Sequence, residues 1–214
     1  MFKTPKTLLN ALALAIVLVS ASPAFAGPPL ICIPFDTGSS KLLAWSPNAG
    51  SNWNAALPSY DLRALTSDTL GVLEADPATL TRMENLRRAT IYAMRDPAIA
   101  QEFLKAMVGR ALSTTPTAAK WFDAGYVIEA YKQAKHLRGV NGSFDRTAWA
   151  AVDETLRVDG YGFVKKAIAM GGPAAEMEFA ASLMTQGAAA TAHRSRAASA
   201  ATRGSLLAAN LAKD

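Results

Sequence analysis

Hydrophobic residues recur from position 60 onward with the spacing of an amphipathic helix. The first stretch shows the pattern at Leu62, Leu65, Thr69, Val72 and Leu73. Positions three and four apart form one stripe on a helix with about 3.6 residues per turn. Aspartate–proline pairs at 76–77 and 96–97 predict two helix boundaries, because aspartate caps a helix and proline fits only its first turn.

Seven helices follow from this pattern. After the three that these pairs delimit, further helices are expected at about 117–137, from 145, at 163–170 and from 173. No segment alternates apolar and polar residues for long, β-branched residues are scarce, and alanine is abundant. We therefore predict an all-α fold of about seven helices over residues 61–185.

Residues 27–60 lack this periodicity. Five prolines and several glycine, serine and asparagine residues interrupt them, as in turns and loops. The same stretch is nevertheless too apolar for a free tail, since it contains Leu30, Ile31, Ile33, Phe35, Leu42, Leu43, Trp45 and Trp53. We expect an ordered, irregular N-terminal arm that packs against the helical body.

Residues 186–214 form an alanine-rich, basic tail of low complexity. Alanine permits a helix, but few large apolar side chains are available to dock it, so we expect a frayed or partly disordered tail. His193, beside Arg194, is expected to be exposed. Four side chains of the tail favour weak contact with an anionic envelope surface: His193, Arg194, Arg196 and Arg203.

The first 26 residues have the order of a secretory signal peptide. Lys3 and Lys6 precede an apolar run at 8–19, and small residues stand at both key positions of Ala24-Phe25-Ala26. The run is shorter than the roughly 20 residues that a membrane helix needs. We expect cleavage at Ala26–Gly27 and a periplasmic or secreted mature chain.

Composition narrows the partners of that chain. Removing 26 of the 214 residues leaves 188, which suits one domain, and lowers the formal net charge from +5 to +3. So mild a charge gives no reason to expect nucleic acid as a partner. The single cysteine, Cys32, excludes an internal disulfide, and it lies too far from the cleavage site to carry a lipid.

Two stretches of the helical region resemble each other. YAMRDPAIAQEF at 92–103 aligns with IAMGGPAAEMEF at 168–179, at a constant offset of 76. WFDAGYVIEAY at 121–131 lies 38 residues beyond 83–93, which is half that offset. The spacing predicts a helical-hairpin repeat of about 38 residues.

The spacing resembles that of the tetratricopeptide family. Trp121, Ala124, Gly125 and Ile128 fall where the family places Trp, Leu, Gly and Tyr in its first helix. Phe103 and Ala106 fall where it places Phe and Ala in its second. The resemblance covers roughly residues 79–185 and implies a short array of helical hairpins with a concave binding groove; an irregular bundle is the alternative. The opening GPPLICIPFD resembles uncharacterised exported bacterial proteins, which implies no function.

Candidates for catalysis are few. Cys32 as a nucleophile would need His136 or His193 as its base. The alternatives for this thiol are a buried packing role or pairing with another molecule. One cysteine and two histidines have no recognised metal-ligand spacing, and neither a phosphate loop nor a dinucleotide fingerprint is present. We expect neither a metal nor another cofactor.

We therefore expect a non-catalytic protein that binds a protein or peptide partner in the cell envelope. Trp45 and Trp53 either pin the arm to the body or line a groove for the partner. The candidate contact residues are Cys32, Trp45, Trp53, Tyr126 and Tyr131. The rival is an enzyme whose acid and base meet only in the folded chain. The oligomeric state stays open.

Overall fold

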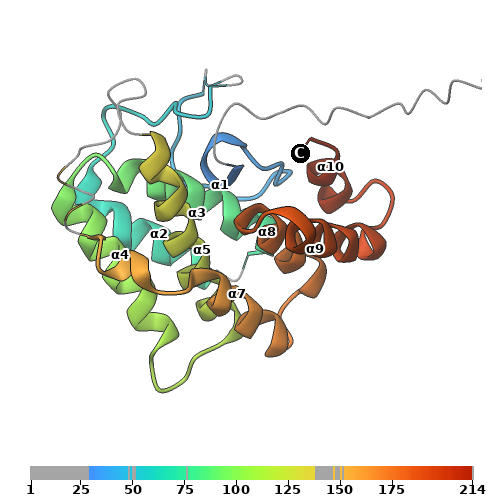
Figure 1. Ribbon diagram of the computed structural model, residues 1–214. Coiled ribbons are helices and arrows are strands. Elements are labelled where there is room, and N and C mark those ends of the chain that lie inside the picture. Colours follow the sequence, from blue (N-terminus) through green and yellow to red (C-terminus); the bar gives the residue numbers. More distant parts are fainter. Residues whose placement is uncertain are drawn as a thin grey trace, which may run out of the picture.

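The computed structural model describes residues 29–47, 49, 52–75, 77–137, 147, 150 and 152–213 (Figure 1). All regular structure in these residues is helical, which confirms the all-α prediction. The α-helices are α1 (Pro29–Cys32), α2 (Leu65–Glu74), α3 (Thr79–Ala93), α4 (Pro97–Ala111), α5 (Ala118–Ala134), α7 (Gly160–Ala169), α8 (Ala174–Met184), α9 (Gly187–Ala200) and α10 (Leu206–Lys213). Short 3-10 helices span Leu62–Ala64, Lys135–Leu137 and Thr155–Arg157.

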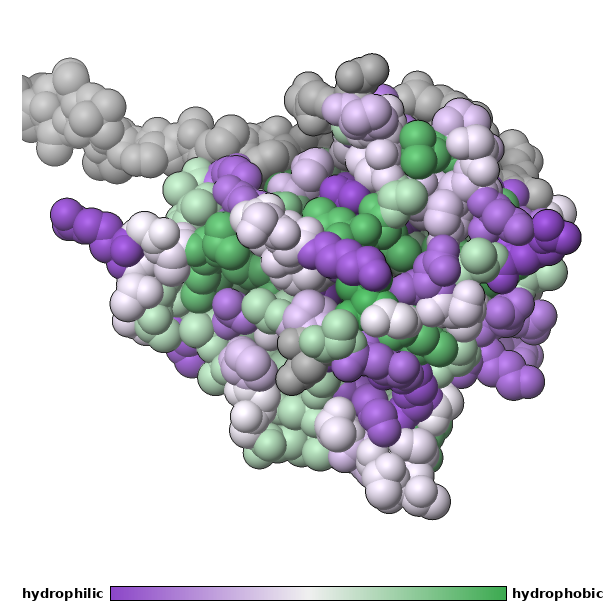
Figure 2. Space-filling model, turned by 180° about the vertical axis from the view of Figure 1, so that it is seen from behind, coloured by the Kyte–Doolittle hydropathy of each residue, from purple (hydrophilic) through white to green (hydrophobic). Residues whose placement is uncertain are grey.

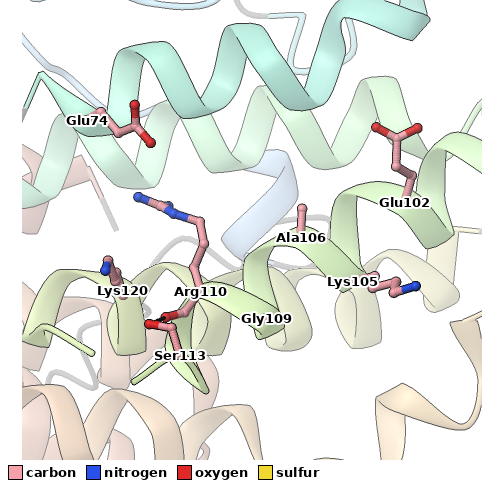
Figure 3. Close-up of a pocket in the computed structure, with 8 residues that line it drawn as sticks. All are labelled: Glu74, Glu102, Lys105, Ala106, Gly109, Arg110, Ser113 and Lys120. Atoms are coloured by element: carbon pink, nitrogen blue, oxygen red, sulfur yellow. Dashed lines mark hydrogen bonds between the residues drawn. The ribbon is translucent and has the colours of Figure 1, made fainter. Parts of the chain in front are cut away.

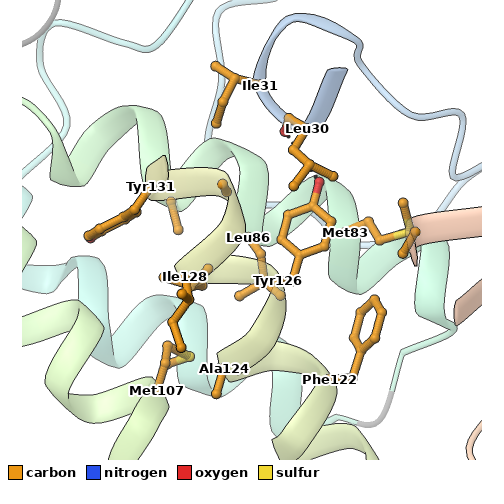
Figure 4. Packing of buried hydrophobic residues seen from close by; sticks show 14 of the residues in the cluster. Leu30, Ile31, Met83, Leu86, Met107, Phe122, Ala124, Tyr126, Ile128 and Tyr131 are labelled. Carbon is orange, nitrogen blue, oxygen red and sulfur yellow. Dashed lines mark hydrogen bonds between the residues drawn. The ribbon is translucent and has the colours of Figure 1, made fainter. Parts of the chain in front are cut away.

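Two helices form the centre of the bundle. In α3, 14 of the 15 residues are buried, and α5 is buried continuously from Trp121 to Tyr131. Helix α5 contacts α1, α3, α4, α7 and α8, so neighbours cover it on several sides. Figure 4 shows its side chains packed against residues of α1, α3 and α4. A helix enclosed in this way shows little amphipathic pattern, because no face is left for water.

Aspartate side chains cap two helices, and Asp96 does so where the sequence predicted a boundary. The Asp96 carboxylate accepts hydrogen bonds from the N–H groups of Ala98 and Ile99 and so begins α4. Asp61 accepts from the N–H of Arg63 at the start of the first 3-10 helix. Asp76, at the other expected boundary, lies outside the described residues, as does Trp149 of the expected fifth helix.

The two similar stretches have the same local structure. The first runs from the end of α3 through a short turn into α4, which begins with Pro97. The second runs from the end of α7 into α8, with Pro173 directly before its first residue. Phe103 and Phe179 occupy equivalent buried positions in the two following helices.

Helices α5 and α7 cross at a contact between two glycines. A Cβ atom on Gly125 would lie 2.5 Å from the carbonyl oxygen of Gly160, and one on Gly160 would lie 2.8 Å from that of Gly125. Real Cβ atoms do not approach other atoms so closely. The two backbones can therefore touch only because neither position has a side chain.

The N-terminal arm is ordered, as predicted. Leu30, Ile31, Ile33, Phe35 and Leu43 are all buried. Helix α1 is the only α-helix in the described part of the arm, and it contacts α3, α5 and α8. Leu30 and Ile31 of α1 are thus part of the hydrophobic core.

The tail is not frayed, so that expectation is wrong. Helix α9 packs along α8, and α10 follows beside the arm (Figure 1). His193 and Asn210 are buried, with 5% and 2% of their surface exposed. Alanine lets neighbouring helices approach closely, and these polar side chains then form specific hydrogen bonds. The tail and the arm together bring the described α-helices to nine instead of about seven.

The surface offers little continuous apolar area in the described part of the chain. Figure 2 shows one face, on which groups of hydrophobic side chains alternate with hydrophilic ones. The large hydrophobic residues that are exposed stand at the ends of different helices: Leu112, Met170 and Leu206. Across the described ranges, none of the helices combines the length and the apolar character needed to cross a membrane.

Candidate partner-binding site

A cavity of about 690 Å³ lies along the outer face of α4 (Figure 3). Six of its lining residues come from α4 and the turn after it, at positions that share one helix face. Glu74 at the end of α2 and Lys120 in the first turn of α5 complete it. The full lining is Glu74, Glu102, Lys105, Ala106, Gly109, Arg110, Ser113 and Lys120. We refer to it as the α4 cavity.

Small residues occupy the middle of the α4 cavity and charged residues its two ends. Ala106 and Gly109 leave the backbone of α4 accessible, and a Cβ atom on Gly109 would meet nothing within 4 Å. Figure 3 shows Glu102 and Lys105 toward one end and Arg110, Ser113 and Lys120 toward the other. A chain segment can therefore approach the helix closely while its polar groups meet charged side chains.

Behind Arg110 lies a buried ion pair. The Nη1 of Arg82 is 2.9 Å and 3.2 Å from the two carboxylate oxygens of Asp123. The same guanidinium donates to the carbonyls of Leu73 and Pro77, which fixes the end of α2 against α3. The Nη1 of Arg110 lies 3.5 Å from Asp123 on the cavity side. Two arginines thus share one carboxylate.

The environment of Asp123 disfavours its charged form. Burial raises the pKa of this carboxyl to about 6, and the charges and hydrogen bonds of Arg82 and Arg110 only partly oppose the shift. Desolvation therefore outweighs the two arginines at this position. Asp123 therefore titrates around pH 6, where a surface aspartate is already almost fully ionised.

The turn between α4 and α5 is held by local hydrogen bonds. The Ser113 hydroxyl donates to the carbonyl of Arg110 at 2.8 Å, and Lys120 Nζ donates to that of Thr115 at 3.0 Å. Thr117 caps α5 by accepting from the N–H of Lys120. This end of the α4 cavity is therefore preorganised rather than formed by long free side chains.

The predicted contact residues Cys32, Trp45 and Trp53 lie elsewhere, where the arm meets α3. Arg87 donates to the carbonyls of Ile31 and Trp53 at 3.0 Å and 2.9 Å. Its guanidinium carbon lies 5.3 Å from the centre of the Trp45 ring, within the range of a cation–π contact. Both tryptophans are partly exposed and packed against the core. These contacts favour the interpretation that the tryptophans pin the arm.

Glu84 is the anion that organises this junction. It accepts hydrogen bonds from Arg87 and Arg88, and a further one at 3.1 Å from the N–H of Phe35. Burial would raise its pKa, but the hydrogen bonds and charges of the two arginines outweigh that and hold the pKa of Glu84 below its usual value. The arm is thus attached to α3 through an ionised, buried carboxylate.

The thiol of Cys32 is poorly suited to nucleophilic chemistry. The side chain is half-buried, and this burial raises its pKa to about 11 although the positive charge of Arg87 opposes the shift. A thiol with so high a pKa is almost entirely protonated at neutral pH, and the thiolate is the reactive form. Its place beside the arm–α3 junction agrees with a packing role.

Tyr126 and Tyr131 offer no surface to a partner, because both are 0% exposed. The Tyr126 hydroxyl donates to the carbonyl of Leu30, and the Tyr131 hydroxyl to that of Ala100. Figure 4 shows Tyr126 directed at the arm. Both hydroxyls satisfy backbone carbonyls inside the core. Through these two hydrogen bonds α5 also holds α1 and α4 in place.

The two histidines lie in different environments. His136 is exposed after α5, whereas His193, which we expected to be exposed, is buried between α7, α8 and α9. Its Nε2 lies 2.6 Å from the Tyr161 hydroxyl, and its Nδ1 contacts the Glu178 carboxylate and the Arg196 guanidinium. We call these four residues the His193 cluster. None of them lines the α4 cavity.

The cations of the tail are largely engaged within the molecule. Arg194 donates to the carbonyl of Leu211, and Arg196 lies 2.9 Å from the carboxylate of Glu178. Arg203 is exposed between α9 and α10. Of the four side chains that favoured an anionic surface, His193 and Arg196 thus hold the tail to the body, and Arg194 joins α9 to α10 within the tail.

Sequence reasoning missed the α4 cavity because its residues look like the solvated face of an ordinary helix. Charges at Glu102, Lys105 and Arg110 fit that interpretation equally well. The only available signal was the pair of small residues, Ala106 and Gly109, between them. The contributions of Glu74 and Lys120 depend on the tertiary fold. Within the described ranges, no group of three or more His, Cys, Asp or Glu side chains is placed to hold a metal ion.

Comparison of the chain with protein-family models, curated proteins and solved structures finds no match. No relative therefore supplies a function or a set of site residues.

Proposed function

We propose that this chain is a non-catalytic binding protein of the cell envelope that holds an extended segment of a peptide or protein partner in the α4 cavity. The observation that carries the proposal is the cavity itself. It has a volume of about 690 Å³ and lies along a helix that is anchored in the core. Its small middle residues admit a backbone, and its charged ends supply orientation. The resemblance of residues 79–185 to tetratricopeptide repeats supports the same class of function.

The envelope location rests on the N-terminal segment. Lys3, Lys6 and the apolar run at 8–19 precede small residues at the expected cleavage site, Ala26–Gly27. Leu30 and Ile31 of α1, which follow the expected cleavage site closely in the sequence, are buried. Fractionation of the native host, with the N-terminus of the mature chain identified by mass spectrometry, tests both the cleavage site and the periplasmic or secreted location.

The non-catalytic part is supported by two of the three groups that the sequence offered for chemistry. The raised pKa of Cys32 keeps its thiol protonated at neutral pH. Both ring nitrogens of His193 are in contact with side chains of its own cluster. Neither residue lines the α4 cavity, so a segment bound there would not meet them.

The binding proposal is tested by filling the cavity. Gly109→Trp places a large side chain into it, and nothing lies within 4 Å of the added Cβ atom, so the core is undisturbed. Gly71→Trp on α2 is the matched control, because its Cβ atom likewise meets nothing within 4 Å and it does not line the α4 cavity. The mature chain and both variants are used to select binders from a displayed library of random 12-residue peptides.

The expected result is a pool of peptides that binds the wild type and Gly71→Trp but not Gly109→Trp. All three proteins must show the same helical content by circular dichroism. If no enriched pool depends on the open cavity, the proposed function is wrong.

A further inference from the structure

Arg110 carries hydrogen-bond donors that are not used by the part of the chain that the structure describes. A guanidinium has five N–H groups, yet the Arg110 side chain makes one hydrogen bond within the described residues, at 3.5 Å to Asp123. That side chain is only 20% exposed, so much of the group is also shielded from bulk water. A partly buried guanidinium with free N–H groups is matched in shape by an incoming carboxylate.

The charged groups around this end of the α4 cavity also favour an incoming anion. Asp123 is already paired with Arg82 at 2.9 Å, and Arg110 lies farther away at 3.5 Å, so one carboxylate faces two positively charged guanidinium groups. Lys120 at the same end keeps two N–H groups beyond the one that it donates to Thr115. It stands in the first turn of α5, where the helix dipole is positive. This end of the α4 cavity therefore favours an anion.

We propose that the α4 cavity recognises an acidic peptide segment and that a carboxylate of this segment binds between Arg110 and Lys120. This inference rests on the proposed function, because it names the chemistry of the partner bound in the same cavity. The carboxylate accepts a bidentate pair of hydrogen bonds from the Arg110 guanidinium and one from the Lys120 ammonium. Ala106 and Gly109 then seat the neighbouring backbone of the segment.

Glu74 sets the selectivity of this end. Figure 3 shows its carboxylate on the side of the cavity that Arg110 faces, and these two side chains form no ion pair in the described structure. Glu74 repels an incoming carboxylate, so the wild-type site binds anions more weakly than the arginine and lysine alone would. Removing this charge should strengthen the binding of an acidic peptide, whereas a cavity that holds no carboxylate at this end would not respond in this way.

The test uses the pool selected on the wild type and four variants of the mature chain. Arg110→Gln removes the fork and its charge, and Arg110→Lys keeps the charge without the fork. Glu74→Gln removes the opposing charge, and Glu102→Gln is the matched control at the other end of the cavity. The probes are the most enriched peptide and the same peptide with each Asp or Glu replaced by Asn or Gln, measured by fluorescence anisotropy.

We expect Asp and Glu to be enriched in the pool and Arg110→Gln to weaken binding about tenfold to a hundredfold, as for loss of a hydrogen bond to a charged group. Arg110→Lys should lie between, Glu74→Gln should bind a few-fold more tightly, and Glu102→Gln should differ little. The amide form of the peptide should lose most of this dependence on Arg110.

The outcomes separate the two proposals. A pool that needs the open cavity but lacks acidic residues, and binds Arg110→Gln as tightly as the wild type, overturns the acidic-segment inference alone. Absence of any cavity-dependent pool overturns both. Tighter binding by Glu74→Gln cannot arise from misfolding, so it supports the inference even if Arg110→Gln proves unstable.

Discussion

Asp36 and Asn210 are 174 positions apart, yet they exchange two hydrogen bonds. The Asp36 N–H donates to Asn210 Oδ1 at 2.8 Å, and Asn210 Nδ2 donates to the Asp36 carbonyl at 2.9 Å. Asn210 is buried and also donates to the carbonyl of Leu206 in its own helix. One side chain of α10 thereby closes the N-terminal arm against the C-terminal helix.

Replacing Asn210 by alanine should release both ends of the chain. The substitution leaves the Asp36 N–H and carbonyl without these partners, so we expect a loss of about 2–3 kcal/mol in the free energy of unfolding. Chemical denaturation measures it, and limited proteolysis should cut the arm faster. Lys213→Ala is the control, since its 3.8 Å contact with Asp36 is half exposed and should contribute less than about 1 kcal/mol. Equal stability of the two variants would contradict this role of Asn210.

The glycine contact between α5 and α7 should tolerate no side chain. Gly125→Ala and Gly160→Ala each force the two backbones apart, and we expect a loss of at least about 2 kcal/mol for either. Gly71→Ala and Gly109→Ala have space for a Cβ atom and should instead stabilise the chain by about 0.5–1 kcal/mol, because alanine favours a helix more than glycine does. Thermal unfolding of the four variants compares the two classes directly. A stable Gly125→Ala protein would mean that α5 and α7 are not so close.

His193 should be required for docking the tail, whereas His136 should not. His193→Ala leaves the Tyr161 hydroxyl and part of the Glu178 carboxylate without this partner in a partly buried position, and we expect a loss of about 2–3 kcal/mol. Hydrogen exchange should show the amides of α9 opening first. His136→Ala removes an exposed ring and should change stability by less than about 0.5 kcal/mol. If the hydrogen-exchange rates of the α9 amides are unchanged in His193→Ala, the His193 cluster does not dock the tail.

Parts of the fold with local signals could be predicted from the sequence. The cap at Asp96 and the proline after it act within one helix turn, so the start of α4 is encoded locally. The order of the arm was predictable because the arm contains more apolar residues than a solvent-exposed tail normally has. In contrast, α9 is docked by His193 and its distant partners Tyr161 and Glu178, and composition does not record such contacts.

The candidate site was less predictable than the fold for the same reason. Arg110 lies on a helix face that looks solvated, and its significance depends on Arg82 having already paired with Asp123. The aromatic residues drew attention instead, but Tyr126 supports the backbone of the arm from inside the core. The type of a side chain suggests its chemistry. Whether the side chain can contact a partner depends on which groups of the fold already bind it.

Cys32 should react slowly with alkylating reagents in the folded protein. With a pKa of about 11 instead of the usual 8.5, its thiolate fraction at pH 8 is lower by roughly a hundredfold or more than in the unfolded chain. We expect iodoacetamide labelling, followed by mass spectrometry, to be slower by that factor in buffer than in guanidinium chloride. Arg87→Gln removes the nearby positive charge and should slow the reaction further wherever the variant stays folded. Equal labelling rates in the folded and unfolded chains would mean that the Cys32 thiol is fully exposed to solvent in the folded protein.

Asp123 should make stability depend on pH in the direction opposite to most carboxylates. Its pKa is about 6 in the folded chain and about 3.9 when unfolded, so the folded chain binds this proton more tightly. The stabilisation is complete below about pH 4 and is lost as the pH rises through 6, by up to about 3 kcal/mol. Glu84, with its lowered pKa, acts in the opposite sense, so the wild type alone does not isolate the effect.

The difference between the wild type and Asp123→Asn isolates this titration, because Glu84 contributes to both proteins. Urea unfolding at pH 4, 5, 6 and 7 should show the wild type losing stability relative to the variant across this range. The ion pair with Arg82 forms as Asp123 ionises, so its contribution is already contained in this titration, whereas the exchange of a carboxyl for an amide group shifts all four values together. A direct check is the side-chain carboxyl carbon of Asp123, whose NMR shift should titrate near pH 6. Titration near pH 3 would mean that the two arginines overcome burial, and Arg110 would then be committed to Asp123 and less available to a partner.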